Sequence, residues 1–129
     1  MQMAQNANGK KSILIVDDEA DICSVLKRSL DGNGYTVSTF TDPGLALEHF
    51  KLAPDVYDVL ITDVRMPKMS GFELARNIKS LNADAKVVVM TAFEIKKSEF
   101  EKVLPSSSID AFLTKPLSVA TLKMTIDKI

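Results

Sequence analysis

The chain has 129 residues, of which 46% are hydrophobic, and this is enough to bury the core of one compact domain. Its 16 basic and 17 acidic side chains give a net charge of -1, so charge favours neither nucleic acid nor a membrane surface as a partner. The single cysteine, Cys23, cannot form an internal disulfide, and no apolar run is long enough to span a membrane. We therefore expect a cytoplasmic protein that binds neither nucleic acid nor membrane directly.

Residues 1–11 are polar and show no helical or strand period, so we expect a flexible tail followed by one domain over residues 12–129. Within the domain, short apolar runs alternate with amphipathic stretches five times. This alternation predicts an α/β fold in which helices cover both faces of a parallel sheet.

The first half of the domain predicts two strands, each followed by a helix. The strands are Ile13–Val16, a run of aliphatic residues, and Tyr35–Phe40, whose Thr and Ser indicate an edge strand with one wet face. The first helix follows an acidic run, ends at the Gly-Asn-Gly turn of residues 32–34, and places four apolar residues on one face: Ile22, Val25, Leu26 and Leu30. The second helix covers Pro43–Leu52, with Asp42 as its N-cap.

The second half adds three strands, which are Val59–Ile61, Val87–Met90 and Ile109–Leu113. Ser70 and Glu73 match the capping box that opens a helix, and the buried stripe of this third helix continues through Leu74, Ile78 and Leu81. We expect a fourth helix before the break at Pro105, around the apolar residues Phe100, Val103 and Leu104. A fifth helix shows apolar residues on one side, at Val119, Leu122, Ile126 and Ile129.

Polar residues stand where the predicted strands end. In a doubly wound parallel sheet these ends lie on one edge, where ligands bind. The residues at that edge are Asp17, Asp18, Asp63, Thr91 and Lys115. Clustered carboxylates repel one another unless a cation is present, and Mg²⁺ prefers such oxygen ligands. A zinc site is not expected, because His49 and Cys23 are predicted on helices away from this edge.

Four segments near the predicted strand ends resemble the receiver domains of two-component response regulators. They read ILIVDDEADI, LITDVRMPKMSG, VVVMTA and FLTKP, and the resemblance extends from Lys11 to the end of the chain. It implies a flavodoxin-like (βα)5 fold with five parallel strands in the order 2-1-3-4-5. It also implies a phosphorylation-activated switch that receives its phosphoryl group from a sensor histidine kinase or a histidine phosphotransfer protein.

The resemblance assigns roles around the acidic edge. Asp63 matches the phosphoacceptor. Asp18 matches a direct ligand of Mg²⁺ (or Mn²⁺), and Asp17 matches a carboxylate that acts mainly through metal-bound water. Asp63 itself and the backbone carbonyl of Arg65 would complete the protein ligands.

The resemblance also implies how phosphorylation would change the conformation of the domain. Thr91 and Lys115 match the hydroxyl and the lysine that contact the phosphoryl group, and Thr91 with Phe112 matches the pair that switches on activation. The Lys115–Pro116 bond matches a cis peptide. The switched face would be formed by the fourth helix, the fifth strand and the fifth helix, where a downstream effector binds. The segment Phe93–Ile109 departs from the family pattern, which affects partner geometry.

Two other functions remain open from the residues. A phosphohydrolase of the haloacid dehalogenase type also uses a strand-end Asp, Mg²⁺, Thr or Ser and Lys, but it expects an Asp where this chain has Arg65. A receiver-like module could instead bind partners without phosphorylation. Nucleotide binding is disfavoured, because the first strand–helix turn reads VDDEAD and lacks the glycine-rich phosphate loop. We expect no enzyme activity beyond the protein's own phosphorylation and dephosphorylation.

Overall fold

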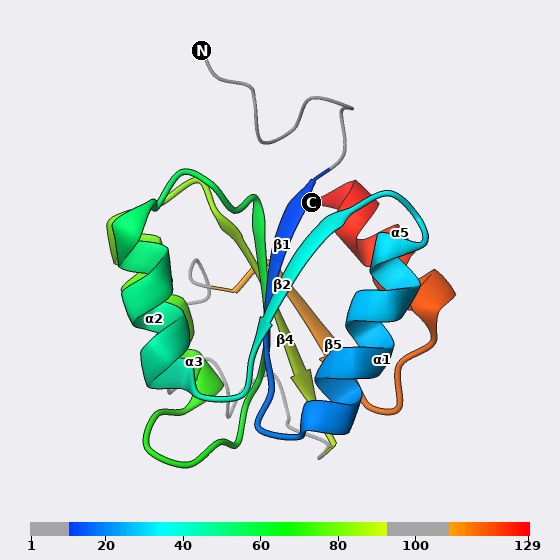
Figure 1. Ribbon diagram of the computed structural model, residues 1–129, viewed down its shortest axis with the longest axis horizontal. Coiled ribbons are helices and arrows are strands. Elements are labelled where there is room, and N and C mark those ends of the chain that lie inside the picture. The colour runs from blue at the N-terminus through cyan, green and yellow to red at the C-terminus, as the bar shows by residue number, and fades with distance from the viewer. Residues whose placement is uncertain (1–10, 93–108) are drawn as a thin grey trace.

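The computed structural model describes residues 11–92 and 109–129, which form three layers with a sheet in the middle. Helices α1 (Ala20–Asp31) and α5 (Val119–Lys128) cover one face of this sheet, and α2 (Pro43–Leu52) and α3 (Gly71–Leu81) cover the other (Figure 1). None of these described helices is long and apolar enough to cross a membrane. The expected fourth helix falls outside the described residues.

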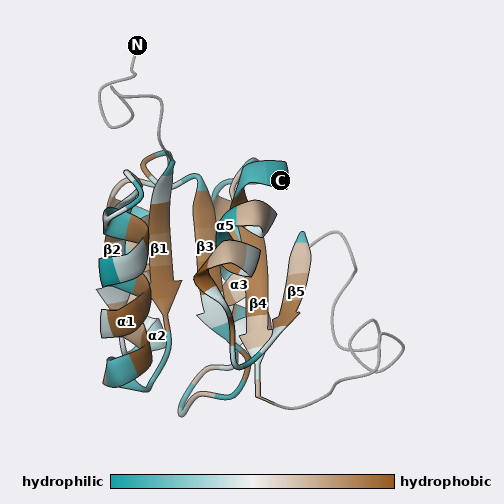
Figure 2. Ribbon diagram, turned by 90° about the vertical axis from the view of Figure 1, so that its right-hand side faces the viewer, coloured by the Kyte–Doolittle hydropathy of each residue, from teal (hydrophilic) through white to brown (hydrophobic). Residues whose placement is uncertain are grey.

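The sheet has five parallel strands in the order β2-β1-β3-β4-β5, as the resemblance implied. The strands are β1 (Ser12–Val16), β2 (Thr36–Phe40), β3 (Val59–Asp63), β4 (Lys86–Thr91) and β5 (Ala111–Thr114). The predicted edge position of β2 is confirmed. The inner strands are coloured as mainly hydrophobic in Figure 2, because helices bury them from both sides.

Three of the described helices begin with a side-chain cap, as local sequence rules favour. Asp42 accepts from the backbone N–H groups of Gly44 and Leu45 at 2.8 and 3.1 Å, so the predicted start of α2 is confirmed. Ser70 accepts from the N–H of Glu73 at 3.1 Å, and Ser118 caps α5 in the same way. The exception is α1, whose N-cap side chain makes no capping bond.

The buried stripes of two helices differ from the prediction. Val25 is 55% exposed, because α1 contacts the sheet through Cys23, Leu26 and Leu30 and turns Val25 to the side. Leu81 is 39% exposed at the last turn of α3. Periodicity located both helices but could not fix their rotation against the sheet to within one residue.

The fifth strand begins two residues later than predicted, and Asp110 gives the reason. Its carboxylate oxygen Oδ2 accepts from the N–H of Val87 at 2.8 Å, where a strand residue would use its carbonyl. The same oxygen lies 2.9 Å from Nζ of Lys79 on α3. Asp110 therefore ties the start of β5 to both β4 and α3.

We expect Asp110→Ala to lower the free energy of unfolding by about 1.5 kcal/mol, because it leaves the Val87 N–H and the Lys79 ammonium without this acceptor. Chemical denaturation measures the change. Asp84→Ala, at an exposed turn residue, is the matched control and should change stability by less than about 0.5 kcal/mol. Equal effects of the two substitutions would show that the contacts of Asp110 contribute nothing.

Candidate functional site

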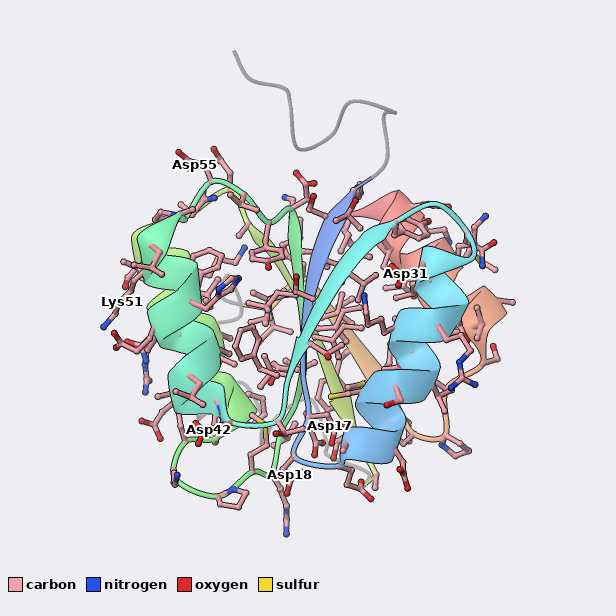
Figure 3. All side chains as sticks on the ribbon, viewed as in Figure 1. Asp17, Asp18, Asp31, Asp42, Lys51 and Asp55 are labelled. Carbon is pink, nitrogen blue, oxygen red and sulfur yellow. The ribbon has the colours of Figure 1, made fainter. Side chains whose placement is uncertain are left out.

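The chain brings the predicted polar residues together at the carboxyl ends of the strands. Asp17 follows β1, Asp63 ends β3, Thr91 ends β4 and Lys115 follows β5. The order of the strands explains the meeting, because β1 and β4 both lie beside β3 in the sheet. Figure 3 shows Asp17 and Asp18 at this edge, with Asp55 at the opposite end of the molecule.

Three carboxylates form the centre of the site. One oxygen from each of Asp17, Asp18 and Asp63 lies within 4.8 Å of the others. Asp17 is fully buried and Asp63 is 8% exposed, whereas Asp18 faces solvent. The Asp17 carboxylate accepts from the N–H of Glu19 at 2.9 Å, and that of Asp63 accepts from the N–H of Val64 at 3.0 Å. These backbone bonds fix the direction of both side chains.

Lys115 brings the positive charge to this cluster. Its ammonium nitrogen lies 2.8 Å from Asp17 Oδ2, 3.5 Å from Asp63 Oδ1 and 3.8 Å from Glu19 Oε2. The backbone N–H of Lys115 donates to the carbonyl of Thr91 at 2.7 Å, which joins the lysine to the end of β4. Glu19 was missed by the sequence analysis, although its place directly after two aspartates was a usable signal.

Burial and the close approach of the carboxylates shift the pKa values of Asp63 and Lys115. Burial, and then the charge of Asp17, raise the pKa of Asp63 above its ordinary value. Burial alone would lower the pKa of Lys115, but the bond to Asp17 and the charges of Asp17 and Asp63 outweigh it and raise that pKa. Lys115 therefore stays protonated at neutral pH, and Asp63 gives up its proton less readily than an ordinary aspartate.

These residues fit a magnesium ion. The cluster offers only oxygen ligands, holds more negative than positive charge, and combines two buried carboxylates with an exposed one that faces water. Mg²⁺ is commonly held by one or two carboxylates while it keeps several waters. The donor set does not suit zinc, which in structural and catalytic sites draws mainly on His and Cys ligands.

Cys23 lies nearer the site than we expected from sequence. Its thiol donates to the backbone carbonyl of Asp17 at 3.3 Å. Burial raises the pKa of the thiol, with the charge of Asp17 acting in the same direction, so the sulfur stays protonated. His49 remains on α2, where its ring nitrogen Nε2 lies 2.8 Å from the hydroxyl of Tyr57. Neither residue offers a metal ligand at this site.

The remaining predicted residues lie around the cluster. Thr91 is 1% exposed at the end of β4, and Phe112 is half-buried on β5, where it packs against the core on the α2 and α3 side. The Lys115–Pro116 peptide bond is cis. Arg65 is exposed in the loop between β3 and α3.

Two contacts hold the loop between β3 and α3 in place. Lys68, with a positive φ of 74°, extends its ammonium to 3.1 Å from Asp42 at the start of α2. Gly71 lies so close to β3 that a Cβ atom there would overlap the backbone oxygen of Asp63 and lie 2.9 Å from its carbonyl carbon. In the sequence, Gly71 was noted only as the last residue of the segment LITDVRMPKMSG, and nothing there indicated this close approach. Its contact with β3 is what lets α3 begin directly beside Asp63.

The raised pKa of Asp63 predicts a stability change with pH. A raised carboxyl pKa means that the folded chain binds this proton more tightly than the unfolded chain, so stability falls as pH rises through that range. Asp63→Asn removes the charge at nearly constant shape. Without divalent cations, we expect the variant to melt at a higher temperature than the wild type at neutral pH.

The difference in melting temperature should shrink as pH falls below the ordinary carboxyl range, where Asp63 is protonated in both folded and unfolded chains. Added Mg²⁺ should raise the melting temperature of the wild type more than that of the variant, since a bound ligand stabilises the folded state. If the variant is less stable than the wild type at every pH, this would contradict the conclusion that folding raises the pKa of Asp63.

Known proteins resemble this chain over most of its length. The family profile for the response regulator receiver domain matches residues 13–127. The chain is 35% identical over 116 residues to the transcriptional regulatory protein ZraR of Klebsiella oxytoca, covering 90% of this chain and 25% of that protein. It is 40% identical over 120 residues to the sensor protein EvgS of Escherichia coli strain K12, covering 93% of this chain and 10% of that protein. The chain thus spans a quarter or less of these two relatives.

Solved structures show the same fold over nearly the whole chain. The chemotaxis protein CheY4 of Vibrio cholerae superposes with a TM-score of 0.83 at 29% identity, covering 93% of this chain and 98% of that one. The response regulator TrrA of Thermotoga maritima, solved in complex with Mg(2+)-BeF, has a TM-score of 0.78 at 35% identity, covering 92% of this chain and 97% of that one. The family match extends from β1 to α5, and on this basis the chain belongs to the response regulator receiver domain family of two-component signalling.

Proposed function

We propose that this receiver domain is switched by phosphorylation of Asp63. The observation that carries the proposal is the position of the Asp63 carboxylate, which lies beside two other aspartates and 3.5 Å from the Lys115 ammonium. The Asp63 side chain is largely shielded from bulk water, although it lies at the carboxyl ends of the strands, where a ligand can reach it. Asp63 is therefore the carboxylate best placed to accept an anionic group.

The donor is a phosphohistidine on a sensor histidine kinase or a phosphotransfer protein. A carboxylate oxygen of Asp63 attacks phosphorus, an oxygen–phosphorus bond forms, and the phosphorus–nitrogen bond breaks with its electron pair left on the imidazole. The product is an acyl phosphate, which water later hydrolyses. Apart from these two reactions on Asp63, the domain has no enzymatic activity of its own.

The other residues of the site bind and screen the phosphoryl group. Lys115 donates an ammonium N–H to one phosphoryl oxygen, and the Thr91 hydroxyl donates to another. Mg²⁺, or Mn²⁺ in its place, would be held by Asp17, Asp18, Asp63 and the backbone carbonyl of Arg65, and would neutralise charge on the transferring group. TrrA was solved with Mg(2+)-BeF, which supports a magnesium site in a chain of this similarity.

The donor protein binds next to Asp63, where the structure offers an apolar groove. The groove has a volume of about 490 Å³ and shares Lys115 with the site. Its walls come from α1 and from the residues after β5, chiefly Ile22, Val25, Leu26, Pro116 and Leu117. A donor that brings a histidine to Asp63 can bury apolar side chains here, among them the exposed Val25.

Phosphorylation then shifts the domain between two states. The phosphoryl group adds about 1.5 to 2 negative charges and draws Thr91 inward, and the vacated space takes the ring of Phe112. This repacking changes the face that includes β5 and α5, where a downstream effector domain or protein binds. The domain itself contacts neither nucleic acid nor membrane, and it acts in the cytoplasm.

Intact-mass measurement after incubation with acetyl phosphate tests the proposal. We expect a gain of about 80 Da, the mass of one phosphoryl group, that requires Mg²⁺ and disappears when the metal is chelated. A wild-type chain that shows no gain at any Mg²⁺ or Mn²⁺ concentration would favour a receiver-like module that binds partners without phosphorylation.

A further inference from the structure

Glu19 stands at the N-cap of α1 but does not cap the helix. The N-caps of α2, α3 and α5 are Asp42, Ser70 and Ser118, and each accepts a bond from the backbone of its own helix. Glu19 makes no such bond, and Glu is not among the residues that N-cap positions prefer. Departures from local rules are expected where a residue serves a site. The carboxylate of Glu19 instead reaches 3.8 Å from the ammonium of Lys115.

The backbone of Glu19 explains why its side chain reaches Lys115. Its N–H donates to Asp17 Oδ1 at 2.9 Å, and its carbonyl accepts from the N–H groups of Ile22 and Cys23 at 3.1 and 3.3 Å. The residue is thus fixed between the carboxylate that binds Lys115 most closely and the first turn of α1. Its side chain is 65% exposed and approaches the ammonium from the solvent side.

An ammonium group has three N–H donors, and three carboxylates surround that of Lys115 in the described part of the chain. Asp17 is the nearest of them, and Asp63 is the one that becomes phosphorylated in the function proposed above. Asp63 therefore gives up its place to a phosphoryl oxygen, while Glu19 keeps its own. Of the carboxylates around Lys115, Glu19 is the one with no part in the proposed metal site.

We infer that Glu19 is a positioning residue for phosphorylation. It holds the Lys115 ammonium from the solvent side, so that one N–H points at the oxygen that the phosphoryl group will bring to Asp63. This inference rests on the proposed function, because positioning matters only if Asp63 is the acceptor. It differs from a general effect of negative charge, which any acidic residue near the site would share.

A double-mutant cycle separates these two explanations. Phosphorylation rates with acetyl phosphate and Mg²⁺ are measured for the wild type, Glu19→Gln, Lys115→Ala and the double variant. Asp21→Asn is the matched control, because Asp21 is also exposed, lies in the first turn of α1, and loses the same charge. Melting curves monitored by circular dichroism establish that each variant is folded.

We expect Glu19→Gln to react about two- to five-fold more slowly than Asp21→Asn, the range of a partly exposed ion pair. In the Lys115→Ala background, replacing Glu19 should change the rate no more than replacing Asp21 does, because the group that Glu19 positions is gone. An equal effect of Glu19→Gln with and without Lys115, or an equal effect of Asp21→Asn, would overturn the inference.

A second readout does not depend on phosphorylation. The ammonium ¹H–¹⁵N signal of Lys115, identified by its loss in Lys115→Ala, should shift or broaden in Glu19→Gln and stay unchanged in Asp21→Asn. If the wild type accepts no phosphoryl group, the proposed function fails, and this signal still decides whether Glu19 holds Lys115. An unchanged signal in Glu19→Gln would reject the positioning role even if phosphorylation occurs.

Discussion

Asp63→Asn is expected to abolish the gain of about 80 Da that acetyl phosphate and Mg²⁺ give the wild type. The amide of Asn is a poor nucleophile and carries no negative charge, while its shape preserves the bond from the N–H of Val64 at 3.0 Å. The loss should therefore be complete and should occur in a folded protein. Intact-mass spectrometry measures the phosphoryl group, and circular dichroism measures the fold.

Asp55→Asn is the matched control for this substitution. Asp55 is an exposed aspartate at the far end of the molecule from Asp17 and Asp18 (Figure 3), so the same change there should leave the mass gain intact. A full mass gain in Asp63→Asn would show that another residue accepts the phosphoryl group. A loss of the gain in both variants would show that the effect is not specific to Asp63. Either result would leave the assignment of Asp63 without support.

Gly71→Ala is expected to have the largest effect on stability, with a loss of about 3 kcal/mol in the free energy of unfolding. The new methyl group would overlap the carbonyl oxygen of Asp63 and lie 3.1 Å from Cα of Val64, both of which are backbone atoms of the sheet edge. Neither can move aside as a side chain could. Relief requires α3 to shift away from β3, and this breaks the 2.8 Å bond from the N–H of Gly71 to the carbonyl of Val64.

The same shift would displace Asp63, the proposed phosphoacceptor, so Gly71→Ala should also be phosphorylated more slowly than the wild type at a temperature where both are folded. Gly32→Ala is the control, because its Cβ would meet its nearest atom, the carbonyl oxygen of Arg28, at 3.4 Å and its φ is -63°. We expect that variant to stay within about 0.5 kcal/mol of the wild type. Equal stability of the two glycine variants would show that the approach of α3 to Asp63 is not tight.

Much of the fold could be predicted because its signals are local. The buried strands are continuous aliphatic runs, and a residue such as Asp42 followed by Pro43 specifies the start of a helix whatever it packs against. The strand order and the meeting of Asp17 with Asp63 followed from a rule about parallel sheets and from the family resemblance. These features depend on the type and spacing of neighbouring residues, which a sequence displays directly.

The distances within the site needed the tertiary structure. Lys115 contacts Asp17 across 98 positions of sequence, and no local pattern states whether the two meet at 2.8 Å or remain apart. Glu19 could be recognised from the sequence only as an acidic residue, because its contact with Lys115 depends on where β5 lies. The close approach of Gly71 to β3 depends in the same way on how α3 packs on that strand. The exposed side of Val25 likewise depends on how α1 is rotated against the sheet.

The sequence by itself thus determined the elements, their order and the chemical character of one edge, because propensity, capping and hydrophobic period act between residues a few positions apart. The tertiary structure decided which atoms touch. Contacts between distant segments depend on strand register and helix rotation, and these are set by the packing of the whole core at once.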